Sequence, residues 1–376
     1  MRSKRKPFVK VVQVLPQLHG GGVERGTIEI AAYLKQLGHE AIVISEGGPL
    51  VEELTAIGVI HVKKSVGSKS LRALHGLWEL RKYLNTTRPD IVHSRSRLPG
   101  WLCYLAIKLL PEEIRPRFIT SVHGLHSVSR YSSIITKGER IEVVSNTAKR
   151  YLLDNYKSVA PEHIRVIQRG VDSAKYNPTV EPSSAWIQDW SRWCQEHQTH
   201  GSPVVSLVGR ISRLKGHHDF LEIIELLHEK SVPAIGLIIG GASKEHPKLH
   251  KELKERVQKS ETLRSSVHFL GHRSDVRELV SLSDIVVSLS ATPEAFGRSV
   301  LEALSLGVSV VGYDHGGVGE LLRALFPAGA VPVGNTQVAA DRIRDLLSGK
   351  HPIEPHELTL QSMREKTIAM YAELIC

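Results

Sequence analysis

The sequence predicts an α/β protein built from two similar domains that face each other across a cleft. At 376 residues the chain is longer than one ordinary domain. A hydrophobic content of 41% and 30 glycines are typical of a folded α/β protein. Short apolar runs alternate with helical periodicities along both halves of the chain. Strands that alternate with helices imply parallel sheets with right-handed crossovers.

The first half opens with a strand, a glycine-rich turn and a helix. A short apolar strand is predicted at 9–15, three consecutive glycines follow at 20–22, and a helix over 27–37 ends at Gly38. This order begins many nucleotide-binding sheets, and glycines let a backbone approach a phosphate closely. The turn has neither the G-x-G-x-x-G pattern nor that of a P-loop, so a merely tight turn explains it equally well.

The same alternation continues to about residue 172, and we place an N-terminal domain at 1–173. Its further strands are predicted at 40–45, 59–63, 91–94, 117–122, 141–145 and 164–167. Its further helices are predicted at 50–57, 70–84, 100–110 and 146–156.

Residues 174–203 break the rhythm and are predicted to be a linker. They hold three prolines and three of the five tryptophans, Trp186, Trp190 and Trp193. A spacing of four and then three residues puts the indoles on one helix face, which favours packing onto a domain over a binding platform.

A second series fills the predicted C-terminal domain, residues 204–354. Its strands are predicted at 204–208, 234–239, 267–270, 285–289, 309–313 and 330–333. Its helices are predicted at 219–228, 248–259, 276–282, 299–306 and 336–347, and the tail 355–376 reads as one more helix. A turn that contains three glycines is predicted at 314–320.

The charge is concentrated in one half of the chain. The net charge is +10, yet residues 1–172 carry 27 Lys and Arg against 15 Asp and Glu, while the remainder carries 22 against 24. A basic half suits anionic lipid, a phosphorylated substrate or nucleic acid. Nucleic acid is the least favoured of these, because zinc-finger spacings and RNA-binding aromatic motifs are absent from the sequence.

The sequence also indicates a cytosolic protein that is soluble or peripheral to a membrane. The three cysteines are far apart and lack metal-ligand or redox spacing, which is typical of reduced thiols. The apolar run near the N-terminus is too short for a signal peptide, and no window reaches the roughly 18 apolar residues of a spanning helix.

The stretch 294–302 carries the most chemistry. Glu294 is predicted on a strand-to-helix loop, Phe296, Gly297 and Arg298 at the start of the helix, and Glu302 about one turn in. Unpaired N–H groups and the positive end of the dipole suit a phosphate there. Two carboxylates that flank a diphosphate suit the hydroxyls of a sugar nucleotide. The alternative is a helix that carries Glu in its first turn for the dipole alone.

Arg210 and Lys215 form a cationic pair on the turn after strand 204–208. Two fixed cations can stabilise a diphosphate leaving group without a metal. The alternative is a solvated basic turn. Ligands of doubly wound sheets bind at the carboxyl ends of strands, where the turns at 20–22, 210–215 and 294–302 all lie.

Together these segments resemble the retaining family 4 glycosyltransferases of the GT-B fold. The two most specific motifs are GRISRLKG at 209–216 and the Glu294-x7-Glu302 spacing. Further similar motifs, in the order the family expects, are GGGVER at 20–25, HSRSR at 93–97, SVHG at 121–124, RGVD at 169–172 and FLGH at 269–272. The resemblance implies two Rossmann-like domains facing across a cleft, with the helix of residues 355–376 crossing back onto the N-terminal domain.

The resemblance also implies a donor site. Gly21 and Gly22 would bring backbone amides to the diphosphate. Arg210 and Lys215 would hold the phosphates. The remaining implied donor contacts are backbone amides at Phe296, Gly297, Arg298 and Ser299, the carboxylates Glu294 for the transferred sugar and Glu302 for ribose, and His272, Arg273 and Val276 around the base.

The resemblance implies catalytic roles for His123 and Glu294. His123 would lie by the reactive face of the sugar, whereas the sequence alone leaves open a His that only fixes its loop. Family members retain the anomeric configuration through front-face attack assisted by the leaving phosphate, so no carboxylate nucleophile, metal or other cofactor is expected. Glu24 would be structural or would orient the acceptor.

Some residues depart from the family pattern or suggest an acceptor. Arg169 stands where many relatives have Asn. Arg95 and Arg97 follow a strand on the acceptor side, and we expect them to bind an anionic acceptor, the alternative being surface solvation. The helix 70–84 places Arg72, Arg81 and Lys82 around Leu71, Leu74 and Trp78, so it is either a contact with an anionic membrane or an ordinary amphipathic helix.

The sequence therefore predicts a cytoplasmic glycosyltransferase, with a candidate peripheral contact at the inner face of the membrane. Its partners would be a nucleotide diphosphate sugar and an anionic glycan or lipid-linked acceptor of the cell envelope, of lipopolysaccharide type, and not nucleic acid. The alternatives are a sugar-nucleotide epimerase or hydrolase of the same fold, and a non-catalytic module that binds a nucleotide sugar.

Overall fold

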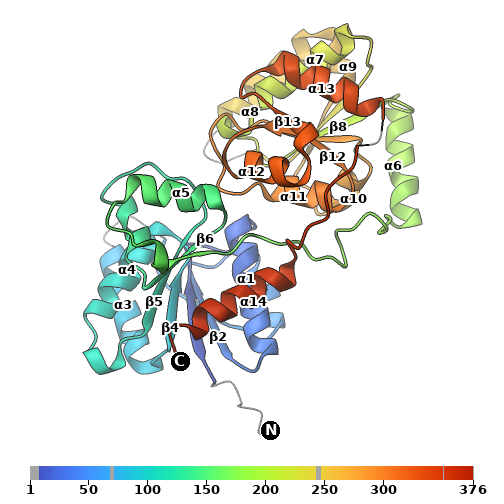
Figure 1. The fold of residues 1–376 in the computed structure, drawn as a ribbon. Helices are drawn as coiled ribbons and strands as arrows, with labels where there is room; N and C mark the ends of the chain where they lie inside the picture. Colours follow the sequence, from blue (N-terminus) through green and yellow to red (C-terminus); the bar gives the residue numbers. More distant parts are fainter. Residues whose placement is uncertain (1–7, 68–71, 243–246, 350, 376) are drawn as a thin grey trace, which may run out of the picture. The chain divides into compact units, whose positions relative to one another are not determined.

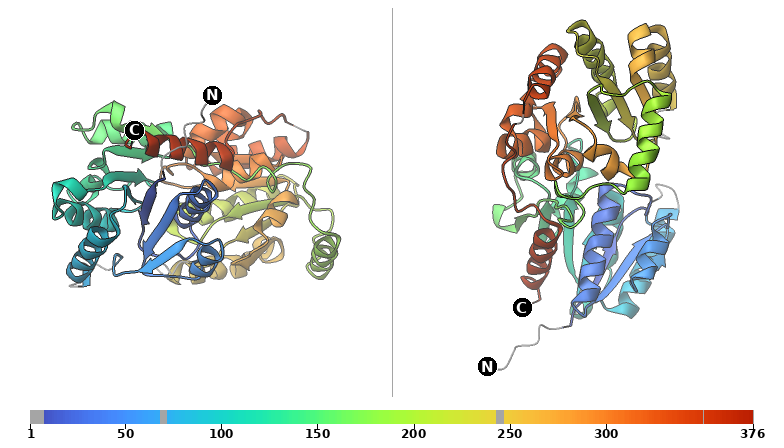
Figure 2. Two further views of the ribbon diagram at one scale, coloured as in Figure 1. Left: turned by 90° about the horizontal axis from the view of Figure 1, so that it is seen from below. Right: turned by 90° about the vertical axis from the view of Figure 1, so that its right-hand side faces the viewer.

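A computed structural model describes residues 8–67, 72–242, 247–349 and 351–375. The chain forms two compact units, the first made of residues 1–169 and 360–376 and the second of residues 170–359. Each unit is a parallel sheet with helices on both faces (Figures 1 and 2). Residues 174–203 thus fall within the second unit, and the last helix of the chain belongs to the first.

The first unit has a seven-stranded parallel sheet in the order β3-β2-β1-β4-β5-β6-β7. Its strands are β1 (Lys10–Val14), β2 (Glu40–Ser45), β3 (Ile60–Lys63), β4 (Ile91–Ser94), β5 (Arg117–Val122), β6 (Arg140–Val143) and β7 (Ile164–Val166). The strand order reverses between β1 and β4. The loops after these two strands therefore flank the crevice where open α/β sheets bind ligands.

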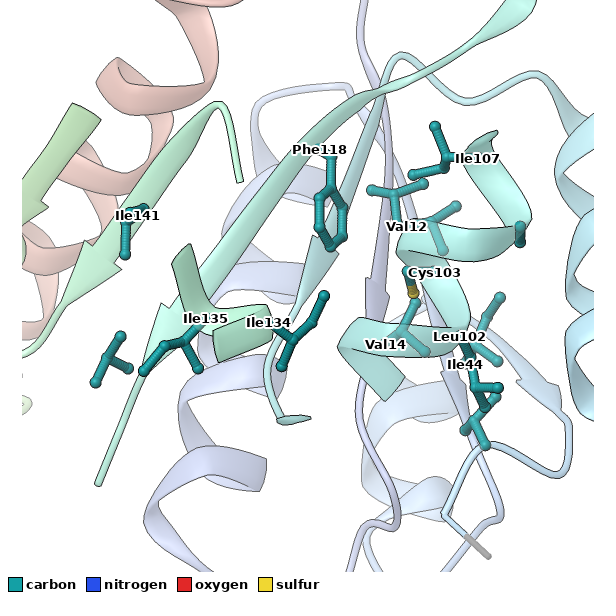
Figure 3. Close-up of a cluster of buried hydrophobic side chains, with 14 of the residues drawn as sticks. Val12, Val14, Ile44, Leu102, Cys103, Ile107, Phe118, Ile134, Ile135 and Ile141 are labelled. Atoms are coloured by element: carbon teal, nitrogen blue, oxygen red, sulfur yellow. The ribbon is translucent and has the colours of Figure 1, made fainter. Parts of the chain in front are cut away.

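The two faces of this sheet carry separate hydrophobic cores. Its helices are α1 (Gly22–Gln36), α2 (Val51–Ala56), α3 (Arg72–Thr87), α4 (Arg97–Lys108), α5 (Asn146–Asn155) and α14 (Leu360–Ala372), with short 3-10 turns at Glu112–Ile114, Ser132–Thr136 and Pro161–His163. Val12 and Val14 face α3, α4 and α5 in the cluster of Figure 3. Val11 faces the other way, toward α1, α2 and α14. Neighbouring strand residues alternate between the cores because strand side chains alternate in direction.

The second unit has a six-stranded parallel sheet in the order β10-β9-β8-β11-β12-β13. Its strands are β8 (Val204–Val208), β9 (Ile235–Ile239), β10 (Val267–Gly271), β11 (Ile285–Ser288), β12 (Ser309–Tyr313) and β13 (Ala330–Val331). Here the order reverses between β8 and β11. The motifs at 209–216 and 294–302 follow these two strands directly, so the topology brings them together.

Helices cover both faces of the second sheet, and the tryptophans pack against it. The helices are α6 (Ser184–Glu196), α7 (His217–Glu229), α8 (Pro247–Lys259), α9 (Glu261–Ser266), α10 (Val276–Ser281), α11 (Arg298–Ser305), α12 (Gly316–Leu325) and α13 (Thr336–Leu347), with 3-10 turns at Arg213–Lys215 and Pro327–Gly329. Trp186, Trp190 and Trp193 of α6 pack on a cluster that includes Ile235 and Leu237 of β9. Their packing onto a domain, predicted from the spacing, is confirmed.

Two predicted boundaries differ from the structure for physical reasons. Residues 314–320 were expected to form a turn because they are rich in glycine, yet α12 begins at Gly316. A Cβ on Gly317 would lie 2.4 Å from Phe296 Cα, so this glycine serves close packing rather than a flexible turn. Helix α1 begins at Gly22 rather than at residue 27, with Gly21 as its N-cap.

In the described ranges, no helix is both long enough and apolar enough to span a bilayer. Cys103 and Cys194 are buried free thiols.

Candidate active site

The centre of the candidate site is an ion pair at the switch point of the second sheet. Lys215 follows β8 and Glu294 follows the neighbouring strand β11. Lys215 Nζ lies 2.8 Å from Glu294 Oε1, and the two side chains are 30% and 26% exposed. Ser290 also donates a hydrogen bond to the same carboxylate oxygen. The structure thus brings together two residues that the sequence singled out separately.

The surroundings keep Glu294 ionised. Burial alone would raise the pKa of this carboxyl, but the Lys215 ammonium and the Ser290 hydroxyl outweigh burial and hold the pKa below its ordinary value. The backbone is fixed as well, because Gly317 N–H donates to Glu294 O at 2.7 Å. An ionised carboxylate in a fixed position can accept hydrogen bonds from hydroxyl groups.

The start of α11 lies beside this pair along the chain. Gly297 caps the helix in the left-handed region, with φ of 107°, and Phe296 just before it is buried and anchors the loop. The positive end of the helix dipole lies at this first turn, which suits an anion. Arg298 Nε donates to Glu302 Oε1 at 2.9 Å. Glu302 therefore lies over the same first turn, as the spacing predicts.

Tyr176 is a neighbour of this turn that the sequence did not reveal. Burial, followed by the charge of Glu302, raises the pKa of Tyr176 to about 12, with Arg298 and Arg277 opposing the shift. Tyr176 lies in the proline-containing segment 174–203, which carries no motif. The sequence around Tyr176 therefore gives no signal that this residue lies near the site.

The loop after β10 is braced from α6. Arg273 donates to both carboxylate oxygens of Asp275, at 2.8 and 2.6 Å, and Trp186 Nε1 donates to Asp275 Oδ2 at 2.7 Å. These hydrogen bonds, with that of Arg273 the largest effect, lower the pKa of Asp275 to about 2.

The other predicted donor contacts lie on neighbouring loops. Val276 is partly buried and packs against the core, and Arg210 is exposed on the loop after β8. His272 faces Gly241, where an added Cβ would lie 3.6 Å from His272 Cβ.

In the first unit, the glycine turn lies at the start of α1. Gly22 is exposed, and a Cβ on Gly21 would lie only 2.5 Å from Glu24 Oε2. The Glu24 carboxylate therefore folds back over the beginning of its own helix. This position favours the structural role considered for Glu24.

His123 follows β5 and meets Arg169. Arg169 Nη2 donates to His123 Nδ1 at 2.9 Å. Burial, and next the charge of Arg169, hold the pKa of His123 well below its ordinary value, while Glu142 opposes the shift. His123 Nε2 is buried and has no hydrogen-bond partner among the described residues.

Arg95 does not face an acceptor, and that prediction is wrong. Its side chain is 0% exposed, and its Nη1 lies 2.5 Å from Glu142 Oε2. Arg95 also donates to Ser121 Oγ at 3.3 Å and to Gly26 O at 3.4 Å. A cation in the core needs a buried anion as partner, and Glu142 on β6 supplies it.

The Arg95–Glu142 pair belongs to a larger buried network. Ser121 Oγ donates to Glu142 Oε2 at 2.5 Å, and His93 Nε2 lies 2.6 Å from Ser121 Oγ. His93 Nδ1 lies 2.8 Å from the hydroxyl of Tyr371 on α14. Burial and the charge of Arg95 lower the pKa of His93 to about 4, so its ring is neutral. The charged Glu142 inside an apolar strand was the one signal of this network in the sequence.

Arg97 differs from Arg95, because it is only half-buried. It starts α4, donates to Ser132 Oγ at 2.9 Å, and lies 5.2 Å from the centre of the Tyr131 ring. A role of Arg97 in acceptor binding stays a prediction.

Helix α3 packs on the sheet through one face and exposes apolar side chains on another. Leu80 and Leu84 are buried, whereas Leu74 and Trp78 are 59% and 57% exposed. The Arg81 guanidinium lies 5.8 Å from the centre of the Trp78 ring. Ser70 and Leu71 of the predicted helix lie outside the described residues, as does the side chain of Arg72.

Comparisons with known proteins agree with this architecture. The family model described as "Glycosyltransferase Family 4" matches residues 20–175, and the model described as "Glycosyl transferases group 1" matches residues 192–366. A glycosyltransferase from Rickettsia africae has a similar structure, with a TM-score of 0.80 and 29% identity, over 98% of this chain and 99% of that one.

Two further proteins extend the likeness. Anabaena HepE, solved in complex with UDP-glucose, has a TM-score of 0.76 at 19% identity, with 98% of each chain covered. The lipopolysaccharide glucosyltransferase WaaG of Escherichia coli is 25% identical over 78% of this chain and 79% of its own length.

The fold and these matches define a glycosyltransferase of the GT-B type. The chain belongs to the family 4 glycosyltransferases, as the sequence motifs predicted.

Proposed function

We propose that this glycosyltransferase is a retaining, metal-independent enzyme that moves a hexose from a nucleotide diphosphate sugar to a cell-envelope glycan. The observation that carries the proposal is the Lys215–Glu294 pair beside the start of α11, at the switch point of the second sheet. It combines a cation and the start of a helix for phosphate with a carboxylate for sugar hydroxyls.

Each part of the donor would bind to a different group of the site. Lys215, the exposed Arg210 and the first-turn N–H groups of α11 would hold the diphosphate. Glu294 would accept hydrogen bonds from the transferred sugar, and Glu302 from the ribose. The complex of HepE with UDP-glucose supports a nucleotide sugar as the donor class.

The chemistry we propose is front-face substitution. The bond between the anomeric carbon and the phosphate oxygen breaks, and the acceptor oxygen bonds to that carbon on the same face. The acceptor proton passes to the leaving phosphate. Lys215 and Arg210 stabilise the negative charge that develops on the diphosphate, so we expect no metal requirement.

The acceptor would be an anionic glycan or a lipid-linked glycan. The basic character of residues 1–172, with 27 Lys and Arg against 15 Asp and Glu, supports an anionic acceptor. The name of WaaG, a lipopolysaccharide glucosyltransferase, supports an envelope glycan of that type. With Arg95 buried, Arg97 is the basic candidate for acceptor binding, and Glu24 stays a candidate for orienting the acceptor.

A peripheral contact with an anionic membrane would place the enzyme near such an acceptor. Exposed Leu74 and Trp78 with Arg81 and Lys82 make α3 the candidate surface. Each basic residue near an anionic surface adds about 1 kcal/mol. Co-sedimentation with vesicles should rise with anionic lipid, fall with salt and fall in a Trp78→Ser variant; binding that ignores all three would remove this contact.

The transfer experiment pairs a panel of nucleotide sugars with envelope glycan acceptors, with and without EDTA. Retention predicts that the anomeric proton of the product shows the configuration of the donor by NMR. EDTA should leave the rate unchanged. An inverted product, or a rate that EDTA abolishes and a divalent metal restores, would contradict the mechanism.

A further inference from the structure

We propose that Arg169 is a positioning residue that holds His123 as a neutral hydrogen-bond donor through Nε2. The inference rests on the proposed function and on the place that the family resemblance implies for His123, by the reactive face of the sugar. It assigns His123 a single chemical task and names the residue that imposes this task.

The proton position follows from the partner. A guanidinium can only donate hydrogen bonds. Because Arg169 Nη2 lies 2.9 Å from His123 Nδ1, the lone pair of Nδ1 must accept, and the ring proton must sit on Nε2. Nε2–H has no acceptor among the described residues. A buried donor without an acceptor is unfavourable, so we expect a ligand oxygen to accept this hydrogen bond.

The charges around His123 keep its ring neutral. The groups that face it are Arg169, Arg95, His93 and Glu142. Burial and the two arginines lower the pKa of His123, and the one opposing carboxylate, Glu142, is already bound by Arg95 and Ser121. A neutral ring whose Nδ1 lone pair is occupied cannot accept a proton from the acceptor. His123 therefore acts as a donor and not as a general base.

Arg169 is itself held firmly by two helices. It is buried, and its Nη1 lies 3.7 Å from Met363 Sδ of α14. On the other side it lies against α1, where a Cβ on Gly26 would be only 2.4 Å from Nη1. Glycine at position 26 is thus what gives the guanidinium room to reach His123.

The direct test is ¹⁵N NMR of the histidine side chains in the full-length protein. The His123 signals are assigned by their loss in a His123→Gln variant. We expect a protonated Nε2, an unprotonated Nδ1 and no titration between about pH 5.5 and 8. In Arg169→Met the Nδ1 donor is gone, so the ring should populate both tautomers and begin to titrate in that range. Arg169→Lys, which can also only donate, should keep the protonated Nε2.

Kinetics give the second readout. Arg169→Met should lower kcat on the order of 10- to 100-fold, because misplacing a catalytic group by about 1 Å costs that much, with less change in the KM for donor. A new loss of rate on the acid side should appear as His123 becomes protonated. Arg169→Lys should recover part of kcat. Arg150→Met, which removes an exposed arginine on α5 of the same unit, is the matched control and should leave kcat and the pH profile unchanged.

The outcomes separate this inference from the proposed function. A wild-type His123 with its proton on Nδ1, or a doubly protonated ring at pH 7, overturns the inference whether or not sugar is transferred. Unchanged kcat and pH profile in a folded Arg169→Met variant also overturn it. If Arg169→Met fails to fold, the wild-type and Arg169→Lys spectra decide. If Nε2 is protonated but no sugar is transferred, the inference about Arg169 stands and the proposed function is wrong.

Discussion

Lys215 Nζ lies 2.8 Å from Glu294 Oε1, although the two residues are 79 positions apart in the sequence. The pair joins the loops of two neighbouring strands at the point where the sheet reverses its order. It holds the cation that we assign to phosphate beside the carboxylate that we assign to the sugar. The ammonium of Lys215 therefore helps to keep Glu294 ionised and in place.

Removing the cation should destabilise the protein in a pH-dependent way. In Lys215→Met, Glu294 stays half-buried without its partner, and we expect a loss of about 1–2 kcal/mol at pH 7. The pKa of Glu294 lies below its ordinary value of 4.5 in the folded protein. The ion pair therefore contributes its full stability above about pH 4.5, and this contribution is lost as the pH falls through the lower pKa of the folded protein. Urea unfolding at pH 7 and pH 3.5 measures the difference, which should shrink at the lower pH.

Lys251→Met serves as the control for this variant, since Lys251 pairs with Glu255 on an exposed helix face. It should change stability little at either pH. A Lys215→Met variant as stable as the wild type at pH 7 would show that the pair contributes nothing to the fold of the loops.

Arg95 should behave as a core residue and not as an acceptor residue. Arg95→Met leaves Glu142 buried and unpaired, so we expect a loss of about 3–5 kcal/mol in urea unfolding. Arg97→Ala should cost well under half of that and should raise the KM for acceptor while donor affinity is unchanged. The reverse result, a stable Arg95→Met with weakened acceptor binding, would restore the original prediction for Arg95.

The last helix is fastened to the first unit by an acidic clamp. Glu373 accepts hydrogen bonds from Arg165 and Arg140, and that of Arg165 first lowers the pKa of Glu373 to about 2. Because the groups are partly exposed, Glu373→Gln should cost only about 1 kcal/mol at pH 7. The pKa of Glu373 is about 4.5 in the unfolded chain and about 2 in the folded protein. The ion pair therefore stabilises the fold fully above about pH 4.5, and this stabilisation is lost as the pH falls toward about 2. Thermal unfolding of the variant and the wild type should therefore converge over this range, and a constant gap would exclude the clamp.

Gly317 should be required for the shape of the donor loop. Gly317→Ala would place a Cβ 2.4 Å from Phe296 Cα, which has to move and take the start of α11 with it. We expect nucleotide affinity to fall at least tenfold, measured by calorimetry. Gly349→Ala is the matched control, because a Cβ there meets no atom within 4 Å. Equal affinity in both variants would mean that the loop tolerates the shift.

Much of the fold could be predicted from the sequence because its strands are buried on both faces. Such strands read as short apolar runs, and 204–208 and 285–289 were placed almost as the structure has them. The site motifs follow these strands directly, and so the switch point gathers Lys215 and Glu294 without any further information.

The features that could not be predicted from the sequence depend on the register between strands and on partners that are distant in the sequence. Arg95 was read as exposed because its partner, Glu142, is 47 residues away and lies opposite Ser121 only through the pairing of β5 with β6. Arg169 was noted only as a departure from relatives, since its bond to His123 needs the folded first unit. Residues 314–320 were predicted to be a turn because glycine is common in turns. In the structure Gly317 instead allows close packing within a helix, and the sequence does not distinguish these two uses of glycine.

The most direct test of the donor site is thermal unfolding with UDP, GDP, ADP and CDP, for the wild type and for Lys215→Ala and Glu302→Ala. A nucleotide at about 100 times its Kd adds roughly 2.7 kcal/mol of stability. We predict that one of the four stabilises the wild type by this order and that both variants lose the effect. If no nucleotide stabilises the wild type, or if the variants keep the full effect, the switch point of the second sheet is not the donor site.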